Sequence, residues 1–361
     1  MVEEAGPSAP AAQVSHAAAI TPSLAAVWTS WRTATEQALY GEHGFYRAQA
    51  PSRHFRTSVH ASPYYAEALL ELLLQVDEAL GRPDPLDLVD VGAGRGEVLT
   101  GMLALAPPDL RERLRPTAVE VAARPADLPA AITWAAAPPP SITGLILANE
   151  WLDNVPVDLV QQTRDGPRLV LVDAAIGAER LGAPPDPADQ AWLDRWWPMT
   201  SRGQRAELGR PRDEAWAGLV GRLQAGVAVA VDYAHAAAAR PPFGSLTAYR
   251  EGRPVAPWPD GTCDLTSHVA LDACAAAGTA AGARHTLLTT QREALLALGL
   301  SGDRPPLGLA STDPTRYVHL LRRASEEAEL VDPSGLGGFG WLVQTVGLPL
   351  PGGLQACHHD G

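Results

Sequence analysis

Residues 86–106 read LDLVDVGAGRGEVLTGMLALA and carry the strongest structural signal in the chain. The opening LDLVDV is an apolar run of strand length, the glycine-rich segment after it is a turn, and the remainder has the apolar content of a helix. A strand, a glycine turn and a helix in this order form half of a βαβ unit. The segment therefore predicts a parallel sheet covered by helices.

Four further strands are predicted after this unit, and helical or loop segments separate them. Strands that alternate with helices indicate an α/β, Rossmann-like fold with a doubly wound, mostly parallel sheet. Ligands of such sheets bind at the carboxyl ends of the strands, where Glu120, Asn149 and Glu150 fall. The predicted strands are TAVEVA (117–122), AITWAA (131–136), GLILANE (144–150) and AGVAVAVDYA (225–234).

The flanking sequence predicts further helices and an insertion. Alternation over 155–182 with an Asp165-Gly166 turn predicts an inserted hairpin. Helices are predicted over 24–40, 64–80, 213–223 and 264–277, a strand or turn followed by a helix over 285–300, and a closing strand over 340–349.

These elements predict four parts of the chain. They are a disordered tail (1–15), an N-terminal helical arm with an active-site loop (16–82), a cofactor-binding core (83–350) with a hairpin and helical lid inserted at about 155–212, and a C-terminal tail (351–361).

Composition excludes several classes of protein. Of the 361 residues, 46% are hydrophobic and 19% charged, and no apolar run reaches the roughly 20 residues of a membrane helix. The acidic start, MVEEAGPSAPAAQ, does not resemble a secretory signal, so we expect a cytoplasmic protein without a membrane partner. The chain has no lysine, which excludes a Walker-type phosphate loop. A net charge of −13 disfavours a nucleic-acid partner.

Thiol and metal chemistry are also disfavoured. Cys263, Cys274 and Cys357 form an odd set without a close pair, which suits neither a disulfide framework nor a zinc site. His358 and His359 lack the spacing of a metal motif, so we predict a solvated tail there.

The glycine turn favours one nucleoside cofactor. Asp90 ends the first strand, and Gly92, Gly94 and Gly96 follow with Gly-x-Gly-x-Gly spacing. A dinucleotide fingerprint needs a glycine where Glu97 stands, so NAD is disfavoured. S-adenosylmethionine has no phosphates, and its site needs glycines for close backbone approach. The sequence therefore predicts a class I S-adenosylmethionine-dependent methyltransferase that binds its cofactor with Asp90 and the three glycines.

Glu120 supports nucleoside binding without identifying the nucleoside. It ends the second predicted strand, where a carboxylate can accept hydrogen bonds from both ribose hydroxyls. A glycine turn followed by an acid can also be an ordinary βαβ corner. No acid directly follows the third strand, so the sequence assigns no contact to the adenine.

The fourth strand ends in the segment LANEWLDNVPVDLV (147–160). Asn149, Glu150 and Asp153 of this segment form a polar cluster beside the predicted cofactor cleft. In class I methyltransferases this strand end faces the transferred methyl group. We therefore predict that Asn149 binds the cofactor and that Glu150 and Asp153 are catalytic residues that hold the acceptor. Loop capping is the alternative for Asp153, and it is less natural for Glu150.

Several motifs, in a shared order, resemble those of the MidA family of methyltransferases. They are ALYGEHGFY (38–46), the loop around Phe55, Thr57 and Ser58, VDVGAGRGEVL (89–99), NEWLDNVPV (149–157), VDYA (231–234), CDLTSHV (263–269) and TTQREALLALGL (289–300). The resemblance implies cofactor contacts from Thr57 and Ser58. It also implies a protein substrate with an arginine acceptor, as for the mitochondrial members that assist respiratory complex I assembly.

One loop departs from the family pattern. His54 and His60 stand where the family has acids, and Arg53 and Arg56 add positive charge. Carboxylates would attract a cationic arginine and imidazoles would not, so we hypothesise that this chain methylates the family's arginine site inefficiently. Two alternatives stay open: a catalytically silent protein that binds S-adenosylmethionine and acts as an assembly or interaction factor, and a nicotinamide oxidoreductase.

Overall fold

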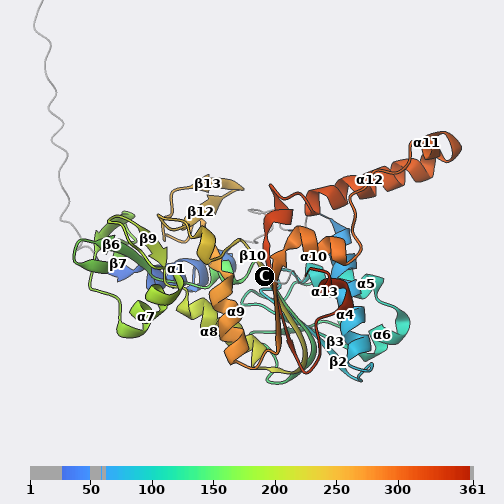
Figure 1. The fold of residues 1–361 in the computed structure, drawn as a ribbon, viewed down its shortest axis with the longest axis horizontal. Helices are drawn as coiled ribbons and strands as arrows, with labels where there is room; N and C mark the ends of the chain where they lie inside the picture. The colour runs from blue at the N-terminus through green and yellow to red at the C-terminus, as the bar shows by residue number, and fades with distance from the viewer. Residues whose placement is uncertain (1–26, 49–57, 59–61, 358–361) are drawn as a thin grey trace, which may run out of the picture.

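A computed structural model describes residues 27–48, 58 and 62–357 of the chain (Figure 1). Its core is a seven-stranded sheet in the order β16-β17-β10-β5-β2-β3-β4. The strands from β4 to β10 are parallel, and β17 is antiparallel to both of its neighbours. The predicted doubly wound α/β sheet is confirmed. The bounds are β2 (Leu86–Val91), β3 (Leu114–Val119), β4 (Thr133–Ala135), β5 (Ile142–Asn149), β10 (Leu223–Asp232), β16 (His285–Thr290) and β17 (Gly340–Val346).

Helices bury both faces of this sheet, because successive strand residues point to opposite sides. On β2, Leu88 lies in the hydrophobic core beneath α4 and α5, whereas Val89 lies in the core beneath α8 and α9. The chain leaves β4 and returns on the other side of β2, to β5, so the connections diverge between these strands and open a crevice at their carboxyl ends. The helices are α4 (Pro63–Ala79), α5 (Glu97–Leu105), α8 (Arg210–Val220) and α9 (Leu271–Ala280).

A second group of elements lies beside the sheet, at the left of Figure 1. Its core joins Trp31, Leu39 and Phe45 of the N-terminal arm to Val172 and Leu265 of inserted strands. The arm is therefore fixed to the insertions. The bounds are β1 (Trp28–Ser30), α1 (Trp31–Tyr40), α2 (Phe45–Ala48), β6 (Leu159–Thr163), β7 (Gly166–Asp173), β8 (Ala178–Leu181), α7 (Pro187–Trp196), β9 (Arg205–Glu207), β12 (Thr247–Arg250), β13 (Arg253–Val255) and β14 (Asp264–Thr266).

The structure corrects three sequence predictions. The helix expected over 24–40 is preceded by a strand, because Trp28–Ser30 pairs with β7 and the Ser30 side chain caps α1. The inserted hairpin turns at Arg164 and Asp165, one residue earlier than expected, since Thr163 pairs with Gly166. The helix expected from Asp264 begins at Leu271, because Asp264–Thr266 pairs with β12.

Other predictions are confirmed, and some elements were not predicted. The helix expected over 64–80 is α4, and the strand and helix expected over 285–300 are β16 and α10 (Gln291–Ala297). Part of the expected C-terminal tail is helical, since α13 (Gly352–Gln355) buries Leu354. Two helices that were not predicted, α11 (Gly308–Thr312) and α12 (Pro314–Leu330), project from the body in Figure 1. The remaining elements are α6 (Pro108–Arg113), η2 (Leu152–Asn154), β11 (Ala234–His235), η3 (Ala237–Ala239), β15 (Val269–Ala270) and η4 (Leu336–Gly338).

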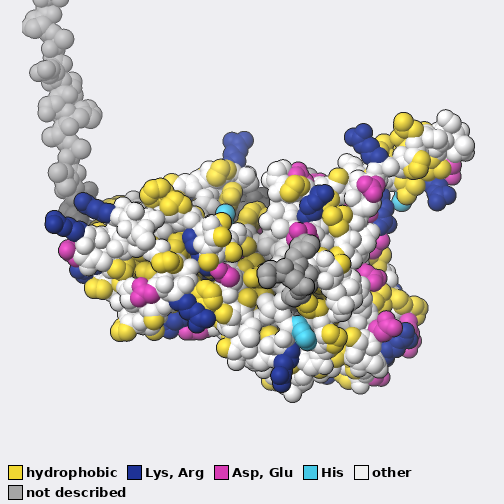
Figure 2. All heavy atoms as spheres, viewed as in Figure 1, with side chains coloured by type: hydrophobic (Ala, Val, Ile, Leu, Met, Phe, Trp, Pro, Cys, Tyr) yellow, Lys and Arg dark blue, Asp and Glu magenta, His cyan; other side chains and the backbone are white. Residues whose placement is uncertain are grey.

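Helix length and surface charge indicate which kinds of partner the protein can have. Within the described ranges, no helix is both long and apolar enough to cross a membrane. On the face that Figure 2 shows, arginine and carboxylate side chains are interspersed.

Close strand packing at two glycines gives a test of the fold. Gly144 of β5 is paired with Gly226 of β10, and a Cβ on Gly226 would overlap the carbonyl oxygen of Gly144. We expect Gly226→Ala to lower the free energy of unfolding by about 2 kcal/mol or more in urea titrations. Gly218→Ala in α8 is the control, because its Cβ would meet nothing within 4 Å. That control should gain about 0.5–1 kcal/mol, and equal stability of the two variants would contradict the packing.

Candidate active site

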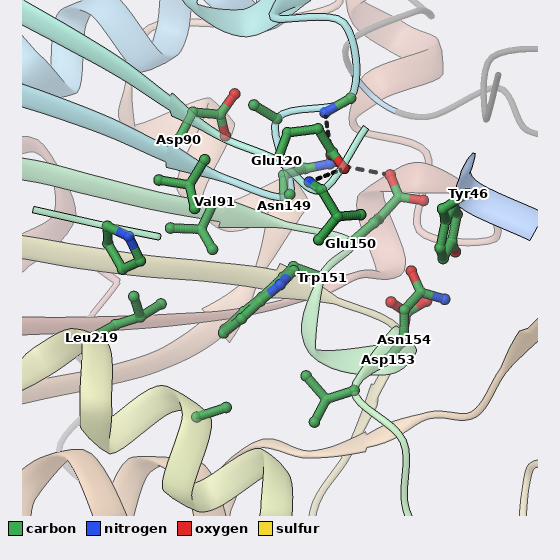
Figure 3. Close-up of a pocket in the computed structure, with 18 of the residues that line it drawn as sticks. Tyr46, Asp90, Val91, Glu120, Asn149, Glu150, Trp151, Asp153, Asn154 and Leu219 are labelled. Atoms are coloured by element: carbon green, nitrogen blue, oxygen red, sulfur yellow. Dashed lines mark hydrogen bonds between the residues drawn. The ribbon is translucent and has the colours of Figure 1, made fainter. Parts of the chain in front are cut away.

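A cavity of about 580 Å³ opens at the carboxyl ends of β2, β3 and β5. The inserted strands and the N-terminal arm complete its wall (Figure 3). Leu219 lies at one end of the view and Tyr46, Asp153 and Asn154 lie at the other, with Trp151 between them. Binding cavities for small molecules have volumes of about 300–1,000 Å³, so this one can hold a nucleoside ligand.

The glycine turn between β2 and α5 forms one wall of the cavity. Gly92, Gly94 and Gly96 have φ values of 72°, 58° and 82°, which side chains rarely adopt. A Cβ on Gly92 would lie 2.9 Å from the Trp151 side chain, and a Cβ on Gly96 would lie 2.5 Å from that of Leu128. Gly92 and Gly94 line the cavity and leave their backbone open to close approach by a ligand, whereas Gly96 is buried and does not line it.

Glu120 follows β3 directly and lies against the glycine turn. Its Oε2 accepts the Gly94 N–H at 3.1 Å, and its Oε1 accepts the N–H groups of Val121 and Ala122 at 2.7 and 3.1 Å. Dashed lines in Figure 3 mark hydrogen bonds from backbone N–H groups to this carboxylate. Three backbone donors thus fix an anionic group beside the turn.

Asp90 is the last acid of β2 and is 3% exposed. Burial raises the pKa of its carboxyl group to about 8, and Glu97 and Glu120 add to the shift. In the described part of the chain, no donor stabilises its ionised form. A buried carboxylate in this state is complementary to a cationic group on a ligand.

Glu150 follows β5 in a strained backbone conformation, with φ at 50°. Its own N–H is held by the Val231 carbonyl at 2.7 Å. The side chain accepts the Asn149 amide at 3.2 Å and the backbone N–H of Ser58. Burial, and secondarily the charge of Asp153, raises the pKa of Glu150 to about 8. Strain of this kind costs about 1–3 kcal/mol and is common at functional sites.

Two further predicted residues are anchored within this network. Asn149 accepts the Tyr65 hydroxyl at 2.7 Å, which fixes its amide orientation toward Glu150. The Ser58 side chain is buried and donates to Gln291 at 3.1 Å. Thr57, like Arg53, His54, Arg56, His60, His358 and His359, lies outside the described residues.

Asp153 lies on the short turn η2 and borders the other end of the cavity. Its Oδ2 accepts the Thr266 hydroxyl at 2.8 Å. Burial raises the pKa of its carboxyl group. The turn is held by the buried Arg212, whose guanidinium donates to the carbonyls of Asp153 and Val155.

The structure adds site residues that the sequence did not assign. Tyr46 of the arm donates to Asp264 at 2.7 Å, and Tyr40 donates to the Asn154 carbonyl at 3.1 Å. Burial raises the pKa of Asp264 to about 7, and Asp153 adds to the shift. Tyr233 and Tyr249 complete this end of the cavity. Tyr46 lies in the motif GEHGFY and Asp264 lies in the motif CDLTSHV. The hydroxyl and the carboxyl group in these motifs were the sequence signals for site residues.

In the described ranges, no group of three or more His, Cys, Asp or Glu side chains is arranged to hold a metal ion. The cysteines in these ranges are free thiols.

Comparison with known proteins gives a family and a fold. Residues 68–289, more than half of the chain, match the model of a family described as S-adenosyl-L-methionine-dependent methyltransferase. A COG1565 superfamily member from Burkholderia thailandensis, bound to S-adenosyl-homocysteine, is 23% identical with a TM-score of 0.76, over 92% of each chain. A second COG1565 superfamily structure from the same organism is 25% identical with a TM-score of 0.73, over 89% of this chain and 88% of that one. No curated protein matches the chain in sequence.

The residues of the cavity fit S-adenosylmethionine. The left-handed glycines allow a phosphate-free nucleoside to approach the backbone, and Asp90 offers a buried carboxyl group whose ionisation a cationic ligand would favour. The fold and this site define a class I S-adenosylmethionine-dependent methyltransferase. More narrowly, the chain belongs to the MidA family of these enzymes, which is the COG1565 group.

Cofactor binding gives a test of the glycine turn and its acid. We expect Glu120→Ala to weaken S-adenosylmethionine binding by about 10- to 100-fold, because hydrogen bonds to a charged group contribute about 1.5–3 kcal/mol. Calorimetry measures the affinity, and circular dichroism checks the fold. Glu112→Ala, an exposed acid on α6, is the matched control. Unchanged affinity in a folded Glu120→Ala variant would remove the role of Glu120.

Proposed function

We propose that this enzyme methylates a nitrogen of a cationic acceptor, and that the acceptor is a protein arginine or a related group. The observation that carries the proposal is the charge of the cavity end beyond Trp151, which is lined by the buried Asp153 and Asp264 and the half-buried Glu150. Arg222 is the one basic residue among the described residues that line the cavity, and it donates to the Pro138 and Pro139 carbonyls. A guanidinium would supply the missing positive charge. We call this end the acceptor chamber.

The proposed cofactor site lies at the other side of Trp151. S-adenosylmethionine, when bound, supplies a methyl group activated by a sulfonium. We infer that Gly92 and Gly94 give it backbone contacts, that Gly96 shapes the turn from behind, and that Glu120 accepts its ribose hydroxyls. Asp90, Asn149 and the loop of Thr57 and Ser58 would hold its charged amino-acid part, for which the raised pKa of Asp90 is the supporting observation.

Glu150 has the features of the group that holds the acceptor nitrogen. It follows the strand that borders the cofactor site, and its side chain is oriented by Asn149 and by the Ser58 N–H. Methyl transfer needs the acceptor nitrogen in line with the methyl carbon, and a fixed carboxylate provides this alignment. Asp153 is proposed to contribute its negative charge from the wall, because Thr266 occupies one of its oxygens.

A direct assay tests the acceptor class. Lysate of the source organism is incubated with the purified protein and methyl-labelled S-adenosylmethionine, and mass spectrometry then identifies the labelled atom. Label on arginine or another side-chain nitrogen supports the proposal, and label on oxygen or carbon contradicts it. Cofactor binding without any transfer favours the silent assembly factor.

A peptide with the family's target arginine tests the hypothesis about the loop that carries His54 and His60. The peptide is offered to the native chain and to a His54→Asp, His60→Glu variant.

The role of Glu150 predicts separate effects on binding and turnover. Glu150→Gln keeps the size of the side chain and removes its charge. We expect it to bind S-adenosylmethionine within about twofold of the native protein and to lower kcat about 10- to 1,000-fold, because a charge-assisted bond contributes about 1.5–3 kcal/mol and often more when buried. Glu71→Gln, on the exposed side of α4, is the control. Loss of affinity with retained turnover would make Glu150 a cofactor ligand.

The raised pKa of Glu150 predicts a pH dependence. Only the ionised carboxylate attracts a cation, and the free enzyme ionises it near pH 8. At saturating S-adenosylmethionine, kcat/KM for the acceptor should therefore rise with pH up to about 8 and then level off. A guanidinium keeps its charge over this range, so it does not produce the rise. The rise should be absent in Glu150→Gln, and its persistence there would assign it to another group.

A further inference from the structure

Two carboxyl groups meet behind the acceptor chamber. Asp232 is the last residue of β10 and is fully buried, and Asp153 on η2 is 6% exposed. The Asp232 carboxyl group lies within hydrogen-bonding reach of Asp153 and lowers the pKa of that residue. Ionised carboxylates only accept hydrogen bonds, so a contact between two of them requires one proton.

The remaining contacts of the pair leave one oxygen on each side for this proton. Asp232 Oδ2 accepts the Leu152 N–H at 2.9 Å, and Asp153 Oδ2 accepts the Thr266 hydroxyl at 2.8 Å. The Oδ1 atoms of both residues are buried and have no donor among the described residues. A buried acceptor without a donor costs about 1–3 kcal/mol, and one shared proton removes this cost at both oxygens.

Neighbouring charges also favour protonation of one member. The buried cation Arg212 donates to the carbonyls of Asp153, Val155 and His268 and to the Ser267 hydroxyl, and its hydrogen bonds within the described residues include neither carboxylate. The other titratable groups that influence Asp232 or are influenced by it are Glu150, the Tyr233 hydroxyl and the Cys274 thiol. A single arginine therefore faces more than one acid.

Asp232 is the member that holds the proton. It is not among the residues that line the cavity, and no hydroxyl of the described residues donates to it, whereas Asp153 has the Thr266 donor. Burial, and then the charge of Asp153, raises the pKa of Asp232 well above its usual range.

We propose that Asp232 is a neutral carboxylic acid that donates to Asp153 and thereby positions the Leu152–Asn154 turn, with Asp153 kept ionised beside the acceptor chamber. Asp232 is a positioning residue in this arrangement. Because Trp151 precedes the turn and packs on Gly92, the same pair also supports the cofactor side of the site. The protonation of Asp232 does not depend on which acceptor the enzyme uses.

The test is the pH dependence of thermal stability for Asp232→Asn. The amide can accept from Leu152 and donate to Asp153, as the neutral acid does. The unfolded native chain releases the Asp232 proton above about pH 4, whereas the folded chain keeps it, so stability of the native chain falls as pH rises. We expect the Tm of Asp232→Asn to exceed that of the native chain by a margin that widens by about 2 °C per pH unit between pH 6 and 9. Other acids of the site are present in both proteins.

A second variant separates the hydrogen bond from the side-chain volume. Asp232→Val has a similar size but leaves the Leu152 N–H and the Oδ1 atom of Asp153 unpaired. We expect it to lower the Tm at every pH and to weaken S-adenosyl-homocysteine binding, whereas Asp232→Asn binds within about twofold of the native chain. If Asp232→Val does not fold, the Asp232→Asn series still decides.

Two results would overturn the proposal. A Tm for Asp232→Asn below that of the native chain across the pH range would show that Asp232 is ionised. A constant Tm difference between pH 6 and 9 would show that no proton is taken up by the pair. Both measurements use stability and product binding alone, so the absence of methyl transfer in lysate would contradict the proposed function and leave this test intact.

Discussion

The site is held together by one buried cation. Arg212 of α8 is 2% exposed, and its guanidinium donates to three carbonyls and one hydroxyl in two loops. One loop follows β5 and carries Asp153, and the other follows β14 and carries Ser267 and His268. Removal of a buried charged partner costs about 3–5 kcal/mol, because the groups left behind are neither solvated nor paired. The geometry of the acceptor chamber therefore depends on a residue that lies behind its wall.

Around this anchor the cavity has an excess of buried acids. Burial raises the pKa values of Asp90, Glu150 and Asp264 toward or above neutrality, so the folded protein forgoes the stability of ionised, solvated carboxylates. Such an arrangement is suited to cationic ligands, which restore the charge balance on binding. The cofactor and the proposed acceptor both carry positive charge. The electrostatics of the cavity thus connect the family's chemistry to particular side chains of this chain.

The acceptor chamber is assembled from distant parts of the sequence. Tyr40 and Tyr46 come from the N-terminal arm, Asp264 and Thr266 come from a strand inserted after β10, and Glu150 follows a strand of the core sheet. The arm reaches the chamber because its apolar face packs on the inserted strands, in the core around Trp31 and Leu39. Substrate specificity can therefore change through the arm and the insertions while the cofactor sheet is retained.

The sequence by itself determined the sheet class, the glycine turn, Glu120 as the acid next to that turn, and the cluster of Asn149, Glu150 and Asp153. These features are local, because strand periodicity and turn glycines depend on neighbouring residues. Only the tertiary structure revealed the strand at Trp28–Ser30, the Tyr46–Asp264 bond and the carboxyl pair of Asp153 and Asp232. The strand depends on pairing with β7, which is more than a hundred residues away in the sequence. The Tyr46–Asp264 bond and the carboxyl pair depend on burial, which sets both the partners and the protonation of an acid.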